Sequence, residues 1–166
     1  MFPLNRIAEN SHTSSSGDSY TATGFNAATG PQSNSCNPLG NPPYPSYTSS
    51  DGPNWVGFLS TTYNESLILT YNFAQDGAIV DSSLVPPYLP TTPSMKHQIQ
   101  NDFSPRYGNQ TSFTPWTSND SLFGFFIGIN DIGNSYTQKN KSDVQTNIFV
   151  EYANLLEEVC FLSLYV

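Results

Sequence analysis

LFGFFIGI, at residues 122–129, is the stretch that decides the fold of this chain. It is apolar on both faces, as expected of a parallel strand buried between two layers. A second buried strand is predicted over residues 67–74, LILTYNFA, and a short helix over residues 53–59, with Trp55 and Phe58 on its apolar side. Because strands alternate with helices, the sequence predicts an α/β sandwich around a parallel sheet.

Two longer helices are predicted from apolar residues at helical spacing. One begins near Ser94 and stops before Pro105, and its spaced apolar residues are Met95, Ile99 and Phe103. The other is capped by Ser142 or Asp143. Its apolar face is formed by Val144, Ile148, Tyr152, Leu155, Leu156 and Val159, with Glu151, Glu157 and Glu158 on the other side. Residues 17–53 are rich in glycine and proline and are predicted to be loop.

Composition and charge limit the partners of this protein. The 166 residues suffice for one domain with a core, and an apolar content of 37% is typical of a folded chain. The net charge of −8, with five Lys and Arg, provides no basic surface for nucleic acid or an anionic membrane. No apolar run approaches the ~20 residues that span a bilayer. We expect no nucleic-acid and no membrane partner, and the oligomeric state is left open.

Four Asn-x-Ser/Thr sequons are glycosylation candidates, at Asn64, Asn109, Asn119 and Asn140. They fit either a glycosylated secretory protein or chance in a chain rich in these residues. Residues 1–16 lack the apolar segment of a signal peptide, which conflicts with secretion. The two cysteines, Cys36 and Cys160, fit no metal motif, and whether they form a disulfide is left open. We expect no metal and no cofactor.

The first turn that carries a candidate catalytic residue is Gly17-Asp18-Ser19. A serine hydroxyl is a poor nucleophile until a base takes its proton, so enzymes expose the serine on a tight turn. Gly17 permits such a turn, and Asp18 can cap a following helix or brace the loop. Taken alone, the tripeptide is also compatible with an ordinary capped turn.

Two further turns follow the predicted strands. Gly77 comes after the strand that ends near Ala74, where backbone can approach a ligand closely. Asn130 and Asp131 follow Gly128, and the Asn130 amide can donate to an anion. Each turn alone is an ordinary strand end, but ligand sites in parallel α/β sheets gather at the carboxyl ends of strands.

Four segments carry a resemblance to a known family. They are GDSYTATGFN at residues 17–26, GPNWV at 52–56, LTYNFA at 69–74 and FIGINDIGNSY at 126–136. In this order and spacing they resemble the GDSL (SGNH) serine esterases, and most of all the fungal carbohydrate esterase family 16. The resemblance covers roughly residues 17–159 and implies an SGNH-hydrolase-like three-layer sandwich around a parallel sheet.

The resemblance also implies a serine acyl-enzyme mechanism. Ser19 is then the nucleophile, and the oxyanion hole comprises the N–H groups of Ser19 and Gly77 and the side chain of Asn130. The supporting residues are Asp18, Gly128 and Asp131. Asp76 departs from the family's pattern, because a carboxylate beside an oxyanion hole is unfavourable unless it points away.

The implied activity is that of an acetylesterase that deacetylates carbohydrate derived from plant polysaccharide, or another small ester. The alternative is a non-catalytic carbohydrate-binding remnant of such an esterase. In that case Trp55, Trp116 and the tyrosines stack on sugars, although packing in the core or in loops is also compatible with these residues.

Both ends of the chain depart from the family. An apolar strand precedes the serine turn in the family, whereas residues 12–16, HTSSS, do not predict a buried strand. The family also continues to an Asp-x-x-His that supplies the triad acid and base, and this chain has none. His12 and His97 are predicted to be solvated surface residues.

The expected organisation is therefore a sandwich that is incomplete at both ends. It consists of an atypical polar leader over residues 1–16, the N-terminal half of a hydrolase domain over 17–159, and an aberrant tail over 160–166. We expect such a fragment to be inactive, and its intact parent to be an extracellular, secreted protein.

Overall fold

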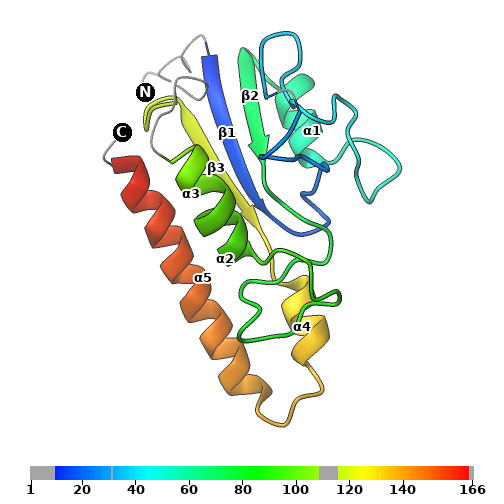
Figure 1. Ribbon diagram of the computed structural model, residues 1–166, viewed down its shortest axis with the longest axis vertical. Helices are drawn as coiled ribbons and strands as arrows, with labels where there is room; N and C mark the ends of the chain where they lie inside the picture. Colours follow the sequence, from blue (N-terminus) through cyan, green and yellow to red (C-terminus); the bar gives the residue numbers. More distant parts are fainter. Residues whose placement is uncertain (1–9, 31, 109–115, 165–166) are drawn as a thin grey trace, which may run out of the picture.

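The computed structural model describes residues 10–30, 32–108 and 116–164 (Figure 1). Three strands, β1 (Asn10–Gly17), β2 (Leu67–Asn72) and β3 (Ser121–Phe126), form one parallel sheet in the order β2-β1-β3. The helical segments are α1 (Trp55–Thr61), α2 (Met95–His97), η1 (Gln98–Phe103), α3 (Ser104–Arg106), α4 (Ile129–Ser135) and α5 (Lys141–Leu164). The predicted α/β class with a parallel sheet is confirmed.

Helices pack on both faces of this sheet. On one face, Ser60 of α1 shares a 2.6 Å hydrogen bond with Thr70 of β2. The neighbouring residue Tyr71 points to the opposite face, because side chains alternate along a strand. There it joins the main apolar cluster, in which η1 and α5 supply Ile99, Phe103, Leu155 and Val159. Figure 1 shows α2, η1 and α3 running across this face with α5 beside them. The arrangement is compatible with a three-layer sandwich.

The central strand β1 contradicts the prediction that residues 12–16 do not form a buried strand. Its side chains at positions 11–13, 15 and 16 are buried, and it pairs with β2 on one side and β3 on the other. Backbone pairing on both edges satisfies the peptide groups, whatever the side chains are. The flanking strands supply the bulk, since Tyr71 and Phe123 lie on either side of Ser14. Residues 10–16 thus belong to the sheet rather than to a leader.

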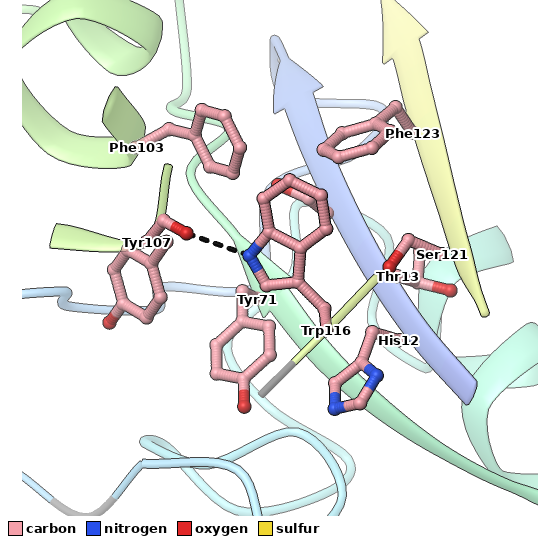
Figure 2. Close-up of a pocket in the computed structure, with 9 residues that line it drawn as sticks. His12, Thr13, Tyr71, Phe103, Tyr107, Trp116, Ser121 and Phe123 are labelled. Atoms are coloured by element: carbon pink, nitrogen blue, oxygen red, sulfur yellow. Dashed lines mark hydrogen bonds between the residues drawn. The ribbon is translucent and has the colours of Figure 1, made fainter. Parts of the chain in front are cut away.

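His12 was predicted to be a solvated residue, but it is buried, with 5% of its surface exposed. Its ring stacks on Tyr71 with centroids 6.4 Å apart, and its Nδ1 lies 3.7 Å from the Asp120 carboxylate. Both rings line a small cavity of about 10 Å³, together with Trp116 and Tyr107 (Figure 2). Burial lowers the pKa of His12 below its usual value, although Asp120 partly opposes this effect. His97 is exposed, as predicted.

The helix predicted from Ser94 is present but continues past Pro105. The Ser94 hydroxyl accepts a bond from the His97 N–H at 3.3 Å and caps the helix, so the predicted start of the helix is confirmed. Residues Met95, Ile99 and Phe103 are buried, also as predicted. The helix continues because η1 is a π-helical turn, in which the Ser104 N–H donates to the Ile99 carbonyl. Pro105 is the second residue of α3, directly after this turn.

The last helix, α5, has the predicted apolar face, with Val144, Ile148, Leu155 and Val159 buried. It continues through Leu164, so residues 160–164 extend the helix, and Leu162 packs against the core. The glutamates were predicted to lie on the other side of the helix from its apolar face, and two of them bind neighbouring elements. Glu151 forms a 2.8 Å ion pair with Lys96, and Glu158 accepts a 2.9 Å hydrogen bond from Gln100.

Two apolar segments are less buried than predicted. In α1 the buried residues are Val56, Gly57 and Ser60, whereas Trp55 and Phe58 are more than a third exposed. In β3, Leu122 and Phe126 are more than half exposed, because β3 is an edge strand of the described sheet and one of its faces is only partly covered. The strand also ends earlier than predicted, and α4 begins at Ile129. No helix in the described ranges is both long and apolar enough to cross a membrane.

Candidate active site

Three loops meet at the carboxyl edge of the sheet, because parallel strands all end on the same side. Ser19 follows β1, Gly77 follows β2, and Asn130 lies in the first turn of α4 after β3. Backbone hydrogen bonds join the loops. The Gln75 N–H donates to the Gly17 carbonyl at 3.1 Å, and the Asp18 N–H donates to the Phe126 carbonyl at 3.2 Å.

Ser19 lies at the tip of a tight turn. The Asp18 carbonyl accepts bonds from the N–H groups of Thr21 at 3.0 Å and Ala22 at 2.9 Å. The Asp18 carboxylate braces the same turn by accepting from the Tyr20 N–H at 3.0 Å. Ser19 itself is half-buried, and its hydroxyl makes no hydrogen bond to any other described residue. The turn therefore presents a serine hydroxyl that is not engaged within the described fold.

Two carboxylates are buried beneath these loops. Both Asp18 and Asp131 are almost fully inaccessible. Asp131 accepts the Val80 N–H on both oxygens, at 3.0 and 3.2 Å, and so fixes α4 to the loop that follows Gly77. Burial raises the pKa of Asp131, and the charge of Asp18 raises it further. Burial likewise raises the pKa of Asp18.

Gly77 has the backbone geometry of a ligand-facing turn. Its φ of +76° is one that residues with a side chain rarely adopt, and no atom lies within 4 Å of the position that a Cβ would occupy. The space beside it is therefore open. The Asp76 carboxylate accepts a 2.9 Å hydrogen bond from the Ser49 hydroxyl, which links it to another loop.

The Asn130 amide is oriented by a neighbouring loop. Its Nδ2 donates to the Ala78 carbonyl at 2.9 Å, immediately after Gly77. A carboxamide nitrogen carries two N–H groups, so one of them remains for a ligand. Gly128, with φ of +122°, turns the chain from β3 into α4 and sets the position of Asn130.

One buried polar residue at this edge was missed by the sequence analysis. Gln98 is fully buried and forms two hydrogen bonds with the peptide groups of Gly17. The signal was present in the sequence, because Gln98 lies between Met95 and Ile99 on the apolar face of its helix. A polar residue at such a position needs a partner inside the protein.

A polar groove of about 300 Å³ lies next to this edge. It is lined by residues of two loops: Gly24 and Tyr47 lie between β1 and α1, and Asp76 and Thr92 lie between β2 and α2. Tyr47 is 78% exposed and packs against Gly24, which has no side chain. Trp116, in contrast, is buried in the core, so it has a packing role. Among the residues that the structure describes, no group of His, Cys, Asp or Glu is placed to hold a metal ion.

The other candidate residues lie on the surface. Asn119 and Asn140 are exposed, Asn64 is half-buried with its Nδ2 donating to the Ser66 carbonyl at 2.9 Å, and Asn109 lies outside the described residues. Cys36 and Cys160 are both exposed and unpaired, so they form no disulfide in this structure.

The fold and the site define a class: an α/β protein with a serine turn, a glycine turn and an asparagine amide at one edge of a parallel sheet. In sequence, the chain is similar to an acetylesterase from Thermothelomyces thermophilus, with 42% identity over 141 residues, or 85% of this chain. The chain spans about half (46%) of that relative's length. No protein-family model and no solved structure matches the chain. The similarity supports an esterase-type family.

Proposed function

We propose that this chain carries the nucleophile and the oxyanion hole of an acetylesterase of the GDSL (SGNH) type. The Ser19 Oγ attacks the carbonyl carbon of the acetyl ester, the bond to the alcohol oxygen breaks, and the alcohol leaves with a proton. Water then attacks the acetyl–Ser19 ester and releases acetate. The observation that carries the proposal is the position of Ser19, Gly77 and Asn130 after three adjacent strands, in a chain similar to an acetylesterase.

The oxyanion of the tetrahedral intermediate is stabilised by three donors in this proposal. They are the N–H groups of Ser19 and Gly77 and the second N–H of the Asn130 amide. The open space beside Gly77 and the hydrogen bond that orients Asn130 support these roles. Removing one such donor costs about 3 kcal/mol of transition-state stabilisation, or roughly a hundredfold in rate.

The described residues include no base hydrogen-bonded to Ser19. His12 lies five residues before Gly17 along β1, so it is roughly 16 Å from the carboxyl edge of the sheet. His97 is exposed on α2 and has no hydrogen bond to the serine. Loss of a triad's base costs about a millionfold in turnover. We therefore propose that the 166-residue protein by itself turns over very slowly.

Imidazole added to the solution can replace a missing base, and this provides a direct test. The hydrolysis of p-nitrophenyl acetate is measured with and without imidazole for the wild type and for Ser19→Ala and Asn130→Ala. Asn134→Ala is the matched control, because its amide also lies in α4 and donates to a loop carbonyl, that of Pro86, at 3.1 Å.

We expect an imidazole-dependent rate that Ser19→Ala abolishes, Asn130→Ala lowers about a hundredfold and Asn134→Ala leaves unchanged. If the wild type hydrolyses the ester without imidazole and Ser19→Ala abolishes this activity, the esterase proposal is supported. The proposed low intrinsic rate is then wrong. If Ser19→Ala matches the wild type under both conditions, the esterase proposal is wrong.

The alcohol portion of the ester is proposed to be an acetylated carbohydrate. The polar groove beside Asp76, with exposed Tyr47 at its rim, suits a polyhydroxylated group better than a lipid chain. We expect a lower KM for acetylated xylo-oligosaccharides than for p-nitrophenyl acetate in the imidazole assay. Binding of the oligosaccharide without any Ser19-dependent hydrolysis would instead identify a non-catalytic carbohydrate-binding protein.

A further inference from the structure

The central strand β1 extends beyond its neighbour β2 just before the serine turn. β2 ends at Asn72, which pairs with Ser15, and the Phe73 N–H makes the next bond to the Ser15 carbonyl at 2.8 Å. The Gln75 N–H then donates to the Gly17 carbonyl at 3.1 Å, so the segment after β2 still lies beside β1 at this point. The Gly17 N–H, two residues before Ser19, is not bonded to a carbonyl of that segment. A buried N–H group without a partner is costly, so something else must satisfy it.

The Gln98 side chain supplies the acceptor for this N–H and a second donor to the Gly17 carbonyl. Its Oε1 accepts from the Gly17 N–H at 2.9 Å, and its Nε2 donates to the Gly17 carbonyl at 2.9 Å. The same Nε2 lies 3.4 Å from the Pro93 carbonyl. Because one planar amide binds both the N–H and the carbonyl of Gly17, it restrains the direction of the backbone at that point and not just its distance.

The helix that carries Gln98 is also fixed to the loop after Gly77. The Met95 N–H donates to the Ile79 carbonyl at 2.8 Å, and the Lys96 N–H donates to the Val80 carbonyl at 3.1 Å. One short helical segment thus holds the backbone that leads into Ser19 and the backbone that leaves Gly77. These are the two loops that supply backbone donors in the proposed oxyanion hole.

We propose that Gln98 is a positioning residue for the nucleophile turn, which sets the orientation of Ser19 relative to Gly77; this inference rests on the proposed esterase function. The role requires glutamine. Glutamate at this position cannot donate when ionised and places a negative charge against the Gly17 carbonyl, whereas methionine fills a similar volume without either bond.

The test compares Gln98→Met with the wild type, using the rate at which a fluorophosphonate labels Ser19 in the presence of imidazole. Gln100→Met is the matched control, because Gln100 is exposed on the same helical segment and bonds Glu158 instead. We expect Gln98→Met to label about a hundredfold more slowly per folded molecule, the loss expected from a misplacement of about 1 Å. Gln100→Met should label at the wild-type rate.

Hydrogen–deuterium exchange measures positioning without relying on the chemistry. In Gln98→Met we expect faster exchange in the segment from Gly17 to Ala22, with exchange in β2 and α5 unchanged. A purely structural role would raise exchange throughout the sheet. If Gln98→Met unfolds, Gln98→Glu replaces it in the labelling experiment. Below the pKa of a buried Glu side chain, the neutral acid both donates and accepts hydrogen bonds. The labelling rate of Gln98→Glu relative to the wild type should therefore recover as the pH is lowered.

The outcomes separate the two proposals. If Ser19→Ala is labelled as fast as the wild type, the esterase proposal fails, and only the exchange result then bears on Gln98. If the wild type labels at Ser19 and a folded Gln98→Met labels equally fast with unchanged exchange, the positioning role is wrong. Equal labelling of Gln98→Glu at acidic and alkaline pH, relative to the wild type, would also overturn it.

Discussion

Replacing Gly17 with alanine tests how tightly the serine turn is held against β3. A Cβ at Gly17 would lie 2.3 Å from the Phe126 carbonyl oxygen and 3.2 Å from the Thr21 hydroxyl. The same carbonyl accepts the 3.2 Å hydrogen bond from the Asp18 N–H, so the strands must separate where that bond is made. Overpacking of this kind costs about 1–3 kcal/mol, and the lost hydrogen bond adds about 1 kcal/mol. We therefore expect Gly17→Ala to lower the free energy of unfolding by roughly 2–4 kcal/mol.

Urea unfolding followed by tryptophan fluorescence measures this loss, because Trp116 is buried in the core. With an m-value of about 2 kcal/mol/M, the midpoint should fall by roughly 1–2 M. Gly133→Ala is the control: Gly133 is exposed within α4, and nothing lies within 4 Å of its Cβ position. Alanine there should raise stability by about 0.5–1 kcal/mol. A Gly17→Ala midpoint equal to that of the wild type, with the same m-value, would refute the close approach between Gly17 and Phe126.

Two other predictions concern the core. Because burial lowers the pKa of His12 in the folded protein, the unfolded state binds a proton more readily, and stability should fall as the pH drops below about 6.5. His12→Leu should flatten this pH dependence, whereas His97→Leu, at an exposed position, should leave it unchanged. The free energy of unfolding is measured by urea titration from pH 5 to pH 8. An equal dependence on pH for the wild type and His12→Leu would contradict the prediction. Leu155→Ala removes a fully buried side chain of α5 and should cost about 2–5 kcal/mol, against less than about 0.5 kcal/mol for the exposed Val150→Ala. Similar urea midpoints for these two variants would mean that α5 does not pack on the sheet.

The sequence predicted the parts of the fold that depend on apolar pattern. The strands β2 and β3 and the buried faces of η1 and α5 were all identifiable, because apolar residues repeat there at strand or helical spacing. The central strand β1 was missed, because its side chains carry no such pattern. Its burial is decided by pairing with both neighbours and by bulk from Tyr71 and Phe123, and both are properties of the tertiary structure.

The candidate site was predictable to a similar extent. Ser19, Gly77 and Asn130 follow strands, and a parallel sheet places such residues at one edge, so their neighbourhood could be inferred from order alone. Gln98 could not, since its role depends on which backbone group of Gly17 the neighbouring segment leaves without a backbone partner. The extension of the helix past Pro105 was also not predictable, because it depends on the π-helical turn of η1.

Neutral amides, more than charges, hold this edge together. The side chain of Gln98 binds the backbone before Ser19, and the side chains of Asn54 and Asn72 bind the backbone after it, donating to the Thr21 carbonyl at 2.9 and 2.6 Å. Asn130 in turn binds the loop after Gly77. A carboxamide donates and accepts at once, and it does not titrate. The scaffold of the turn should then keep its geometry across a wide pH range.

The two buried carboxylates are the exceptions in this scaffold. Since burial raises the pKa of Asp18 and Asp131, their ionisation as the pH rises opposes folding, and each adds negative charge beside the position proposed for an oxyanion. Both carboxylates accept backbone N–H bonds, Asp18 from Tyr20 and Asp131 from Val80. Those bonds direct negative charge toward the backbone of the turns. The low charge content of the chain, 11%, thus accompanies a site whose geometry rests on amides and whose two buried carboxylates act as braces beneath it.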